Sequence, residues 1–137
     1  MPRLTGILET CLHVADLARS IEFYRRLFSW PLLARDDRFV ALAVADKQVM
    51  LLFLKGASEH DMRVDGGVIP GHGGDGRLHV AFAIPADDLE AWQHRLADQS
   101  IALASIVLWP SGGTSLYFRD PDEHLVELAT PGVWAVY

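Results

Sequence analysis

Residues 115–128, with the sequence SLYFRDPDEHLVEL, predict two strands joined by a turn at Asp120, Pro121 and Asp122. Proline presets φ for a turn, and the flanking aspartates can bond their own backbone. Large apolar residues alternate with other residues on both sides of this turn. Because a strand has a side-chain period of two, they define one buried face of a sheet. The members of this face are Leu116, Phe118, Val126 and Leu128.

The opposite face of the same two strands carries a carboxylate, Glu127, within the apolar run LVELA. A buried carboxylate without a partner is costly, so a cation, a proton or a bound ligand is expected beside it. The remaining members of this face are Ser115, Tyr117, Leu125 and Ala129.

Composition limits the classes of function. A length of 137 residues and a hydrophobic fraction of 50% fit one folded domain. The net charge of −6 argues against a nucleic-acid partner, because no basic stripe can displace counterions. No apolar run approaches the length of a membrane span, and the single cysteine, Cys11, fits a reducing compartment. We therefore expect a cytoplasmic protein without a membrane or nucleic-acid partner.

The order of predicted elements repeats as βαβββ in each half of the chain. Asp16 is placed to cap the first helix, and Asp87, with Glu90 in a capping box, the second. The glycine-rich residues 56–76 show little periodicity and predict a linker or lid. Strands are expected over 6–14, 31–35, 39–44, 48–55, 77–84, 102–108 and the two sides of the turn at 120–122.

The halves also match residue by residue. Residues 40–53 (VALAVADKQVMLLF) match 116–129 (LYFRDPDEHLVELA), so that Leu51 corresponds to Glu127. The tripeptide His-Val-Ala at residues 13–15 matches the one at residues 79–81. This register predicts that His13, His79 and Glu127 project from one face of a curved sheet. Two imidazoles and one carboxylate form a facial triad with open positions, which is typical of non-haem Fe²⁺ sites. The three residues could meet within one chain or across a dimer.

Three stretches resemble the vicinal oxygen chelate superfamily, which includes glyoxalase I, bleomycin-resistance proteins, extradiol dioxygenases and fosfomycin thiol transferases. They are LHVADLARSIEFYRRLF at 12–28, LHVAFAI at 78–84 and YFRDPDEHLVEL at 117–128. The resemblance implies an α+β fold, two tandem βαβββ modules forming a cupped mixed sheet. Residues 1–137 would be one domain, with module one over about 6–55, module two over about 77–130 and a short C-terminal tail.

The resemblance also implies roles for individual residues. His13, His79 and Glu127 match the superfamily's metal ligands. Leu51 stands where glyoxalase I has a fourth ligand, which favours the three-ligand members. Tyr117 matches an active-site tyrosine of extradiol dioxygenases, although their base histidine would fall near a leucine at 108.

Several of these residues also have a structural interpretation. His13 could be a hydrogen-bonded core residue, and Tyr117 could pack against the facing sheet. His72, in the loop IPGHGG, is either solvated or a lid residue that supplies an acid or base. Arg119 could bind an anionic substrate or pair with a neighbouring aspartate. His60, His94 and His124 are expected on the surface.

We therefore expect a divalent-metal-dependent enzyme, dioxygenase-like or lyase/isomerase-like, whose small, partly apolar substrate chelates the metal through vicinal oxygens. Fe²⁺ or Mn²⁺ is favoured, with Zn²⁺, Ni²⁺ or Co²⁺ as alternatives. The expected substrate-binding residues are Val49, Leu51, Phe53, Tyr117 and Arg119, and the expected assembly is a homodimer. The alternative functions are metal-free sequestration of a small molecule and thiol transfer of the fosfomycin type.

Overall fold

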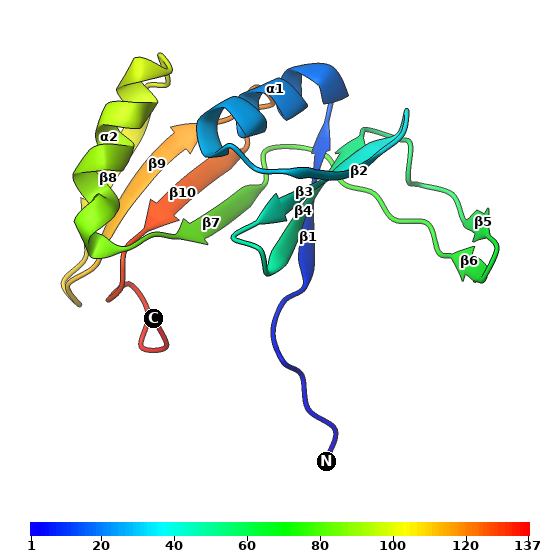
Figure 1. The fold of residues 1–137 in the computed structure, drawn as a ribbon, viewed down its shortest axis with the longest axis horizontal. Coiled ribbons are helices and arrows are strands. Elements are labelled where there is room, and N and C mark those ends of the chain that lie inside the picture. Colours follow the sequence, from blue (N-terminus) through cyan, green and yellow to red (C-terminus); the bar gives the residue numbers. More distant parts are fainter. The chain divides into compact units, whose positions relative to one another are not determined.

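The computed structural model describes residues 1–137, which form two compact units, Met1–Asp75 and Gly76–Tyr137 (Figure 1). Unit 1 contains β1 (Glu9–Val14), α1 (Leu17–Phe28), β2 (Leu32–Arg35), β3 (Phe39–Val44), β4 (Gln48–Leu54), β5 (Met62–Val64) and β6 (Gly67–Ile69). Unit 2 contains β7 (His79–Ala83), a 3₁₀ turn (Ala86–Asp88), α2 (Leu89–Asp98), β8 (Leu103–Leu108), β9 (Thr114–Arg119) and β10 (Leu125–Ala129). Each unit thus contains the predicted βαβββ module.

Each unit builds its own four-stranded mixed sheet, and the two sheets have the same topology. The strand order is β1-β4-β3-β2 in unit 1 and β7-β10-β9-β8 in unit 2. The first strand of each sheet runs parallel to the last strand of its module, and the other pairs are antiparallel. The predicted α+β fold with two tandem modules is confirmed. Neither helix combines the length and the apolar character that crossing a membrane requires.

The core of unit 1 lies between α1 and one face of its sheet. As predicted, the helix begins at Asp16, whose carboxylate accepts a hydrogen bond from the backbone N–H of Arg19 at 3.0 Å. It ends at Ser29, which adopts a left-handed conformation with φ 58°. The buried side chains come from β1, β3, β4 and the inner stripe of α1: Leu12, Val14, Ile21, Tyr24, Leu27, Val40, Leu42, Met50 and Leu52.

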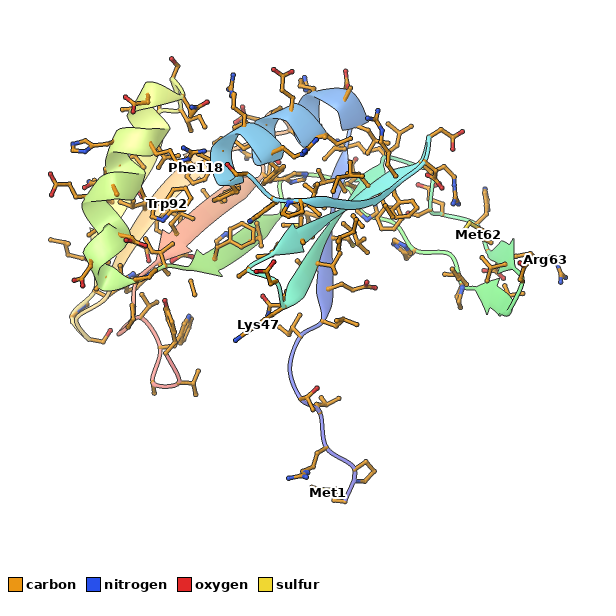
Figure 2. All side chains as sticks on the ribbon, in the orientation of Figure 1. Met1, Lys47, Met62, Arg63, Trp92 and Phe118 are labelled. Carbon is orange, nitrogen blue, oxygen red and sulfur yellow. The ribbon has the colours of Figure 1, made fainter.

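The core of unit 2 contains the apolar face predicted for residues 115–128. Leu116, Phe118, Val126 and Leu128 are all fully buried. Figure 2 labels Phe118 on β9 and Trp92 on α2. The start of α2 differs from the prediction, because a 3₁₀ turn precedes it and its N-cap residue, Asp88, makes no side-chain capping bond. A short turn after Pro85 therefore replaces the capping box expected at Asp87 and Glu90.

The segment predicted as an irregular linker or lid contains a small hairpin. Strands β5 and β6 pair from Met62 with Ile69 to Val64 with Gly67. Figure 2 labels Met62 and Arg63 on this hairpin, which extends away from the sheet of unit 1. Two three-residue strands in a glycine-rich stretch give too few alternations to be detected from the sequence.

The antiparallel hairpins of the two units have the register expected from the internal repeat. Ala41 of β3 pairs with Leu51, and Tyr117 of β9 pairs with Glu127. The match of residues 40–53 with 116–129 predicts both pairs, with Leu51 in the position of Glu127.

The parallel pairs correct the correspondence between the two first strands. Val49 and Leu125 occupy equivalent positions in the repeat, and they lie opposite Glu9 and His79 respectively. The counterpart of His79 is therefore Glu9, and the predicted match of His13 with His79 is wrong by four residues. His13 still lies on the predicted face, because a shift by an even number of residues preserves the alternation.

The turn between β9 and β10 buries a histidine that was expected on the surface. The Oδ1 atom of Asp120 accepts bonds from the backbone N–H groups of Asp122 and His124, both at 2.9 Å. His124 is fully buried, and its Nδ1 accepts a bond from the backbone N–H of Leu78 at 2.9 Å. Glu123, with φ 65°, occupies the left-handed position of the turn. His124 thus ties this turn to the residue that precedes His79.

Candidate functional site

The carboxylate of Glu127 is held inside unit 2 by a chain of hydrogen bonds. The indole Nε1–H of Trp109 donates to Ser115 Oγ at 2.8 Å. The hydroxyl of Ser115 in turn donates to Glu127 Oε1 at 2.5 Å. Glu127 is only 6% exposed, and this chain fixes one of its two oxygens. The other oxygen, Oε2, faces His79.

The imidazole of His79 contacts the backbone on one side and Glu127 on the other. Its Nδ1 lies 3.0 Å from the carbonyl oxygen of Leu125. A carbonyl oxygen can only accept, so this bond places a proton on Nδ1. The second nitrogen, Nε2, lies 3.2 Å from Glu127 Oε2, and half of the side chain is exposed.

This geometry fits a cation between His79 and Glu127. With Nδ1 protonated, a neutral imidazole presents a lone pair at Nε2, and the carboxylate presents another at Oε2. Two acceptors at 3.2 Å repel each other unless a proton or a positive ion lies between them. Metal-bound histidines commonly donate their other ring N–H to a backbone carbonyl, as His79 does to Leu125. The donor set of one imidazole and one carboxylate suits divalent transition metals.

Two more residues predicted for the site lie on the same face of β9. Tyr117 is paired with Glu127, and its ring centroid lies 6.3 Å from that of His79. Burial raises the pKa of the Tyr117 phenol, a hydrogen bond with Ser115 lowers it, and the Glu127 carboxylate raises it again, with a net increase, so the hydroxyl keeps its proton at neutral pH. Arg119 donates from Nη1 to the carbonyl of Glu123 at 3.0 Å. Arg119 therefore contacts the backbone of the turn. The structural alternative expected from the sequence was an ion pair with a neighbouring aspartate.

His13 belongs to unit 1, where it lies in a cluster of rings. It is 3% exposed, and its ring centroid lies 5.9 Å from that of Phe53 and 5.7 Å from that of His72. The structure thus brings His79 and Glu127 together in unit 2, and His13 and His72 together in unit 1.

Unit 1 also contains a mainly apolar cavity of about 510 Å³. Leu51 and Phe53, two of the predicted substrate-binding residues, line it, while Val49 lies outside the lining. The other lining residues include Glu9, Cys11, Phe39, Met62, Ile69 and His72.

Ser115 and Glu9 are two candidate site residues that the sequence pattern did not indicate. A serine on a strand gives no functional signal by itself, although Ser115 was assigned to the face of Glu127. Glu9 could have been found by extending the repeat through the parallel strand pairs, because it occupies the position of His79.

Comparisons with known proteins agree with this fold. The family model described as "Glyoxalase/Bleomycin resistance protein/Dioxygenase superfamily" matches residues 6–128. A glutathione transferase FosA from Serratia marcescens is 30% identical over 128 residues, which cover 91% of this chain and 80% of that protein. A metallothiol transferase FosB from Bacillus licheniformis is 28% identical over 133 residues, which cover 96% and 79% of the two chains.

Solved structures give the same result. A lactoylglutathione lyase from Agrobacterium tumefaciens superimposes with a TM-score of 0.89 at 27% identity, covering 98% of this chain and 99% of that one. A genomically encoded fosfomycin resistance protein, FosX, from Listeria monocytogenes superimposes with a TM-score of 0.70 at 18% identity, covering 96% and 97%. The second similarity concerns the fold alone.

Proposed function

Because the chain belongs to the Glyoxalase/Bleomycin resistance protein/Dioxygenase superfamily, we propose that it is a divalent-metal-dependent enzyme that transfers a small thiol to an oxygen-bearing electrophile. The observation that carries the metal is the pair of facing acceptors, His79 Nε2 and Glu127 Oε2, at 3.2 Å. The thiol is supported by the names of the relatives, which are thiol and glutathione transferases. A structural neighbour is named lactoylglutathione lyase, a name that also contains glutathione.

The proposed metal ligands are His79, Glu127 and a donor from β1. The register of the repeat favours Glu9 as that donor, whereas the sequence motif favoured His13. Two carboxylates and one imidazole favour Fe²⁺ or Mn²⁺, since carboxylate oxygen suits harder ions than thiolate sulfur does. When bound, the ion would act as a Lewis acid towards the oxygen of the electrophile.

The residues of unit 2 then have distinct roles in the transfer. The thiol sulfur forms a bond to carbon as a carbon–oxygen bond breaks, and the released oxygen takes up the proton that the thiol lost. Tyr117, which keeps its phenolic proton, would donate a hydrogen bond to that oxygen. Ser115 would keep the Glu127 carboxylate oriented, and Arg119 would attract an anionic substrate.

Activity with two thiols tests this proposal. The protein, loaded with Mn²⁺ or Fe²⁺, should consume an epoxide such as fosfomycin in the presence of glutathione or L-cysteine. Tyr117→Phe should lower kcat by about 10²-fold, because one donor to the developing charge is lost. The exposed Tyr137 offers a matched control, and Tyr137→Phe should leave kcat unchanged. Conversion of the glutathione–methylglyoxal hemithioacetal, without any reaction with the epoxide, would replace thiol transfer by a lyase reaction.

The third ligand needs its own comparison. Glu9→Gln should weaken Mn²⁺ binding as strongly as Glu127→Gln does, while His13→Gln should leave it unchanged. The reverse result would restore His13 as the ligand that the sequence motif predicted. Mixing Glu9→Gln with Glu127→Gln chains tests the homodimer further, because activity recovered in the mixture requires ligands from two chains.

A second candidate function is metal-free binding of an apolar compound in the cavity of unit 1. The cavity supports it because Leu51, Phe39 and Phe53 form an apolar surface in a volume suited to a small molecule. Chelator-treated protein would then bind the compound as tightly as metal-loaded protein does, and no product would form.

A further inference from the structure

Three potential metal ligands meet in unit 1, in a cluster that includes neither His79 nor Glu127. Cys11 and His13 lie two residues apart on the same face of β1, and His72 comes from the loop after β6. The sulfur of Cys11 and one nitrogen of each imidazole all lie within 4.8 Å of one another. The proposed thiol transfer uses none of these three side chains.

The backbone on both sides of His72 is fixed. Its N–H donates to the carbonyl of Ser58 at 2.8 Å, and its own carbonyl accepts from Ser58 Oγ at 2.7 Å. The ring packs edge-on against Phe53, with centroids 4.7 Å apart. These contacts hold the imidazole above β1, beside Cys11 and His13. The His72 side chain is exposed, as expected for a solvated loop histidine, while its backbone is anchored on both sides.

The loop that carries His72 also lies directly against the His13 ring. A Cβ atom at Gly74 would lie 2.9 Å from Cδ2 and 3.4 Å from Nε2 of His13. Real Cβ atoms essentially never lie within 3.0 Å of another heavy atom, so an alanine at this position would force the loop or the His13 ring to shift. The close packing leaves His13 buried while its ligand nitrogen remains beside Cys11 and His72.

We propose that Cys11, His13 and His72 form a second metal site, selective for thiophilic divalent ions such as Zn²⁺ and Co²⁺. One thiolate and two imidazoles are a donor set typical of zinc, with bonds of about 2.3 Å to sulfur and about 2.0–2.1 Å to nitrogen. Tetrahedral ligands at these bond lengths lie roughly 3.5 Å apart, so the three donors need to move by about 1 Å. His72 is exposed and can supply this movement by rotation of its side chain.

The fourth position of this site opens towards the cavity of unit 1. Cys11 and His72 both line that cavity, together with apolar residues. A tetrahedral ion held by three protein ligands keeps one position for water or a small ligand. An ion in this site could therefore bind water or a small molecule from the cavity at its fourth position. Because one ligand is a thiolate, this site should select softer metal ions than a centre made of His79 and carboxylates does.

Cobalt spectroscopy of the full chain tests this site directly. A thiolate bound to Co²⁺ gives an intense near-ultraviolet charge-transfer band, which imidazole and carboxylate ligands do not give. The parent should show this band and bind about two Co²⁺ ions per chain. Cys11→Ser should lose the band and about one ion. His72→Gln should weaken binding of that ion by at least about 100-fold, because loss of a direct ligand costs more than loss of an outer-shell contact.

Two controls separate this site from the proposed enzyme centre. Glu127→Gln should keep the charge-transfer band and lose the ion held by His79 and Glu127. The two proposed sites can therefore be confirmed or refuted independently. His60→Gln, at an exposed histidine that lines the same cavity, should keep both ions. Gly74→Ala, which leaves all three donors in the chain, should weaken the band because the loop is pushed from His13. Absence of the band from the parent, or its survival in Cys11→Ser, would overturn the proposal.

Discussion

Replacing Ser115 by alanine should weaken both the metal-free fold and metal binding. The hydroxyl of Ser115 donates to Glu127 Oε1 at 2.5 Å and accepts from Trp109 Nε1 at 2.8 Å. A hydrogen bond to a charged group contributes about 1.5–3 kcal/mol. The Trp109 bond contributes less, because the residue is 37% exposed and water can replace the lost acceptor. We therefore expect the free energy of unfolding to fall by about 1.5–3 kcal/mol.

The effect of Ser115→Ala on metal affinity follows from the same contact. Without its partner the Glu127 carboxylate can rotate, and loss of such an outer-shell contact typically costs about 10–100-fold in metal affinity. Urea unfolding with chelator present measures the first effect, and calorimetric Mn²⁺ titration measures the second. Ser105→Ala, at an exposed serine on the neighbouring β8, should change the free energy of unfolding by less than about 0.5 kcal/mol. A stability loss with unchanged Mn²⁺ affinity would refute the reasoning, because Ser115 would then support the fold alone.

Three further predictions concern other parts of the chain. His124→Phe keeps a buried aromatic ring, although a larger one, and leaves the Leu78 N–H without its acceptor. Thermal unfolding should therefore show a loss of about 1–3 kcal/mol, while His94→Phe, at an exposed position of α2, should be neutral. Burial raises the pKa of the Cys11 thiol, and the Glu9 carboxylate raises it further. Iodoacetamide should therefore alkylate Cys11 of the metal-free protein more slowly than it alkylates glutathione between about pH 7 and 9, and Glu9→Gln should accelerate the reaction. An equal rate in the parent and in Glu9→Gln would contradict this. Sedimentation at micromolar concentration should give a homodimer, and a monomer would refute the predicted pairing.

The alternation of side chains explains why much of the fold could be predicted. The apolar face of residues 115–128 and the two antiparallel hairpins follow from a period of two and a turn of fixed length. A slip by one residue would expose the whole apolar set, so the sequence specifies these registers strongly. Asp16 likewise marks the start of α1, because its carboxylate satisfies a backbone N–H that the helix leaves free.

The register of the parallel strands could not be obtained in this way. Moving β1 by four residues relative to β4 keeps the same side chains on the same face, so alternation does not distinguish Glu9 from His13. The tripeptide shared by residues 13–15 and 79–81 then favoured the wrong match. The burial of His124 could not be predicted either. The residue lies in a polar turn, and its ring nitrogen meets its partner, the backbone N–H of Leu78, only in the folded chain.

The metal affinity of Glu127→Gln tests the central claim most directly. Parent protein prepared without chelator should bind one Mn²⁺ or Fe²⁺ ion through His79 and Glu127, while the neutral amide is a poor ligand for a hard cation. The variant should lose Mn²⁺ binding by at least about 100-fold and keep its fold in circular dichroism. Glu123→Gln, at the exposed residue of the β9–β10 turn, should bind like the parent. Mn²⁺ binding by Glu127→Gln with the affinity of the parent would contradict the account.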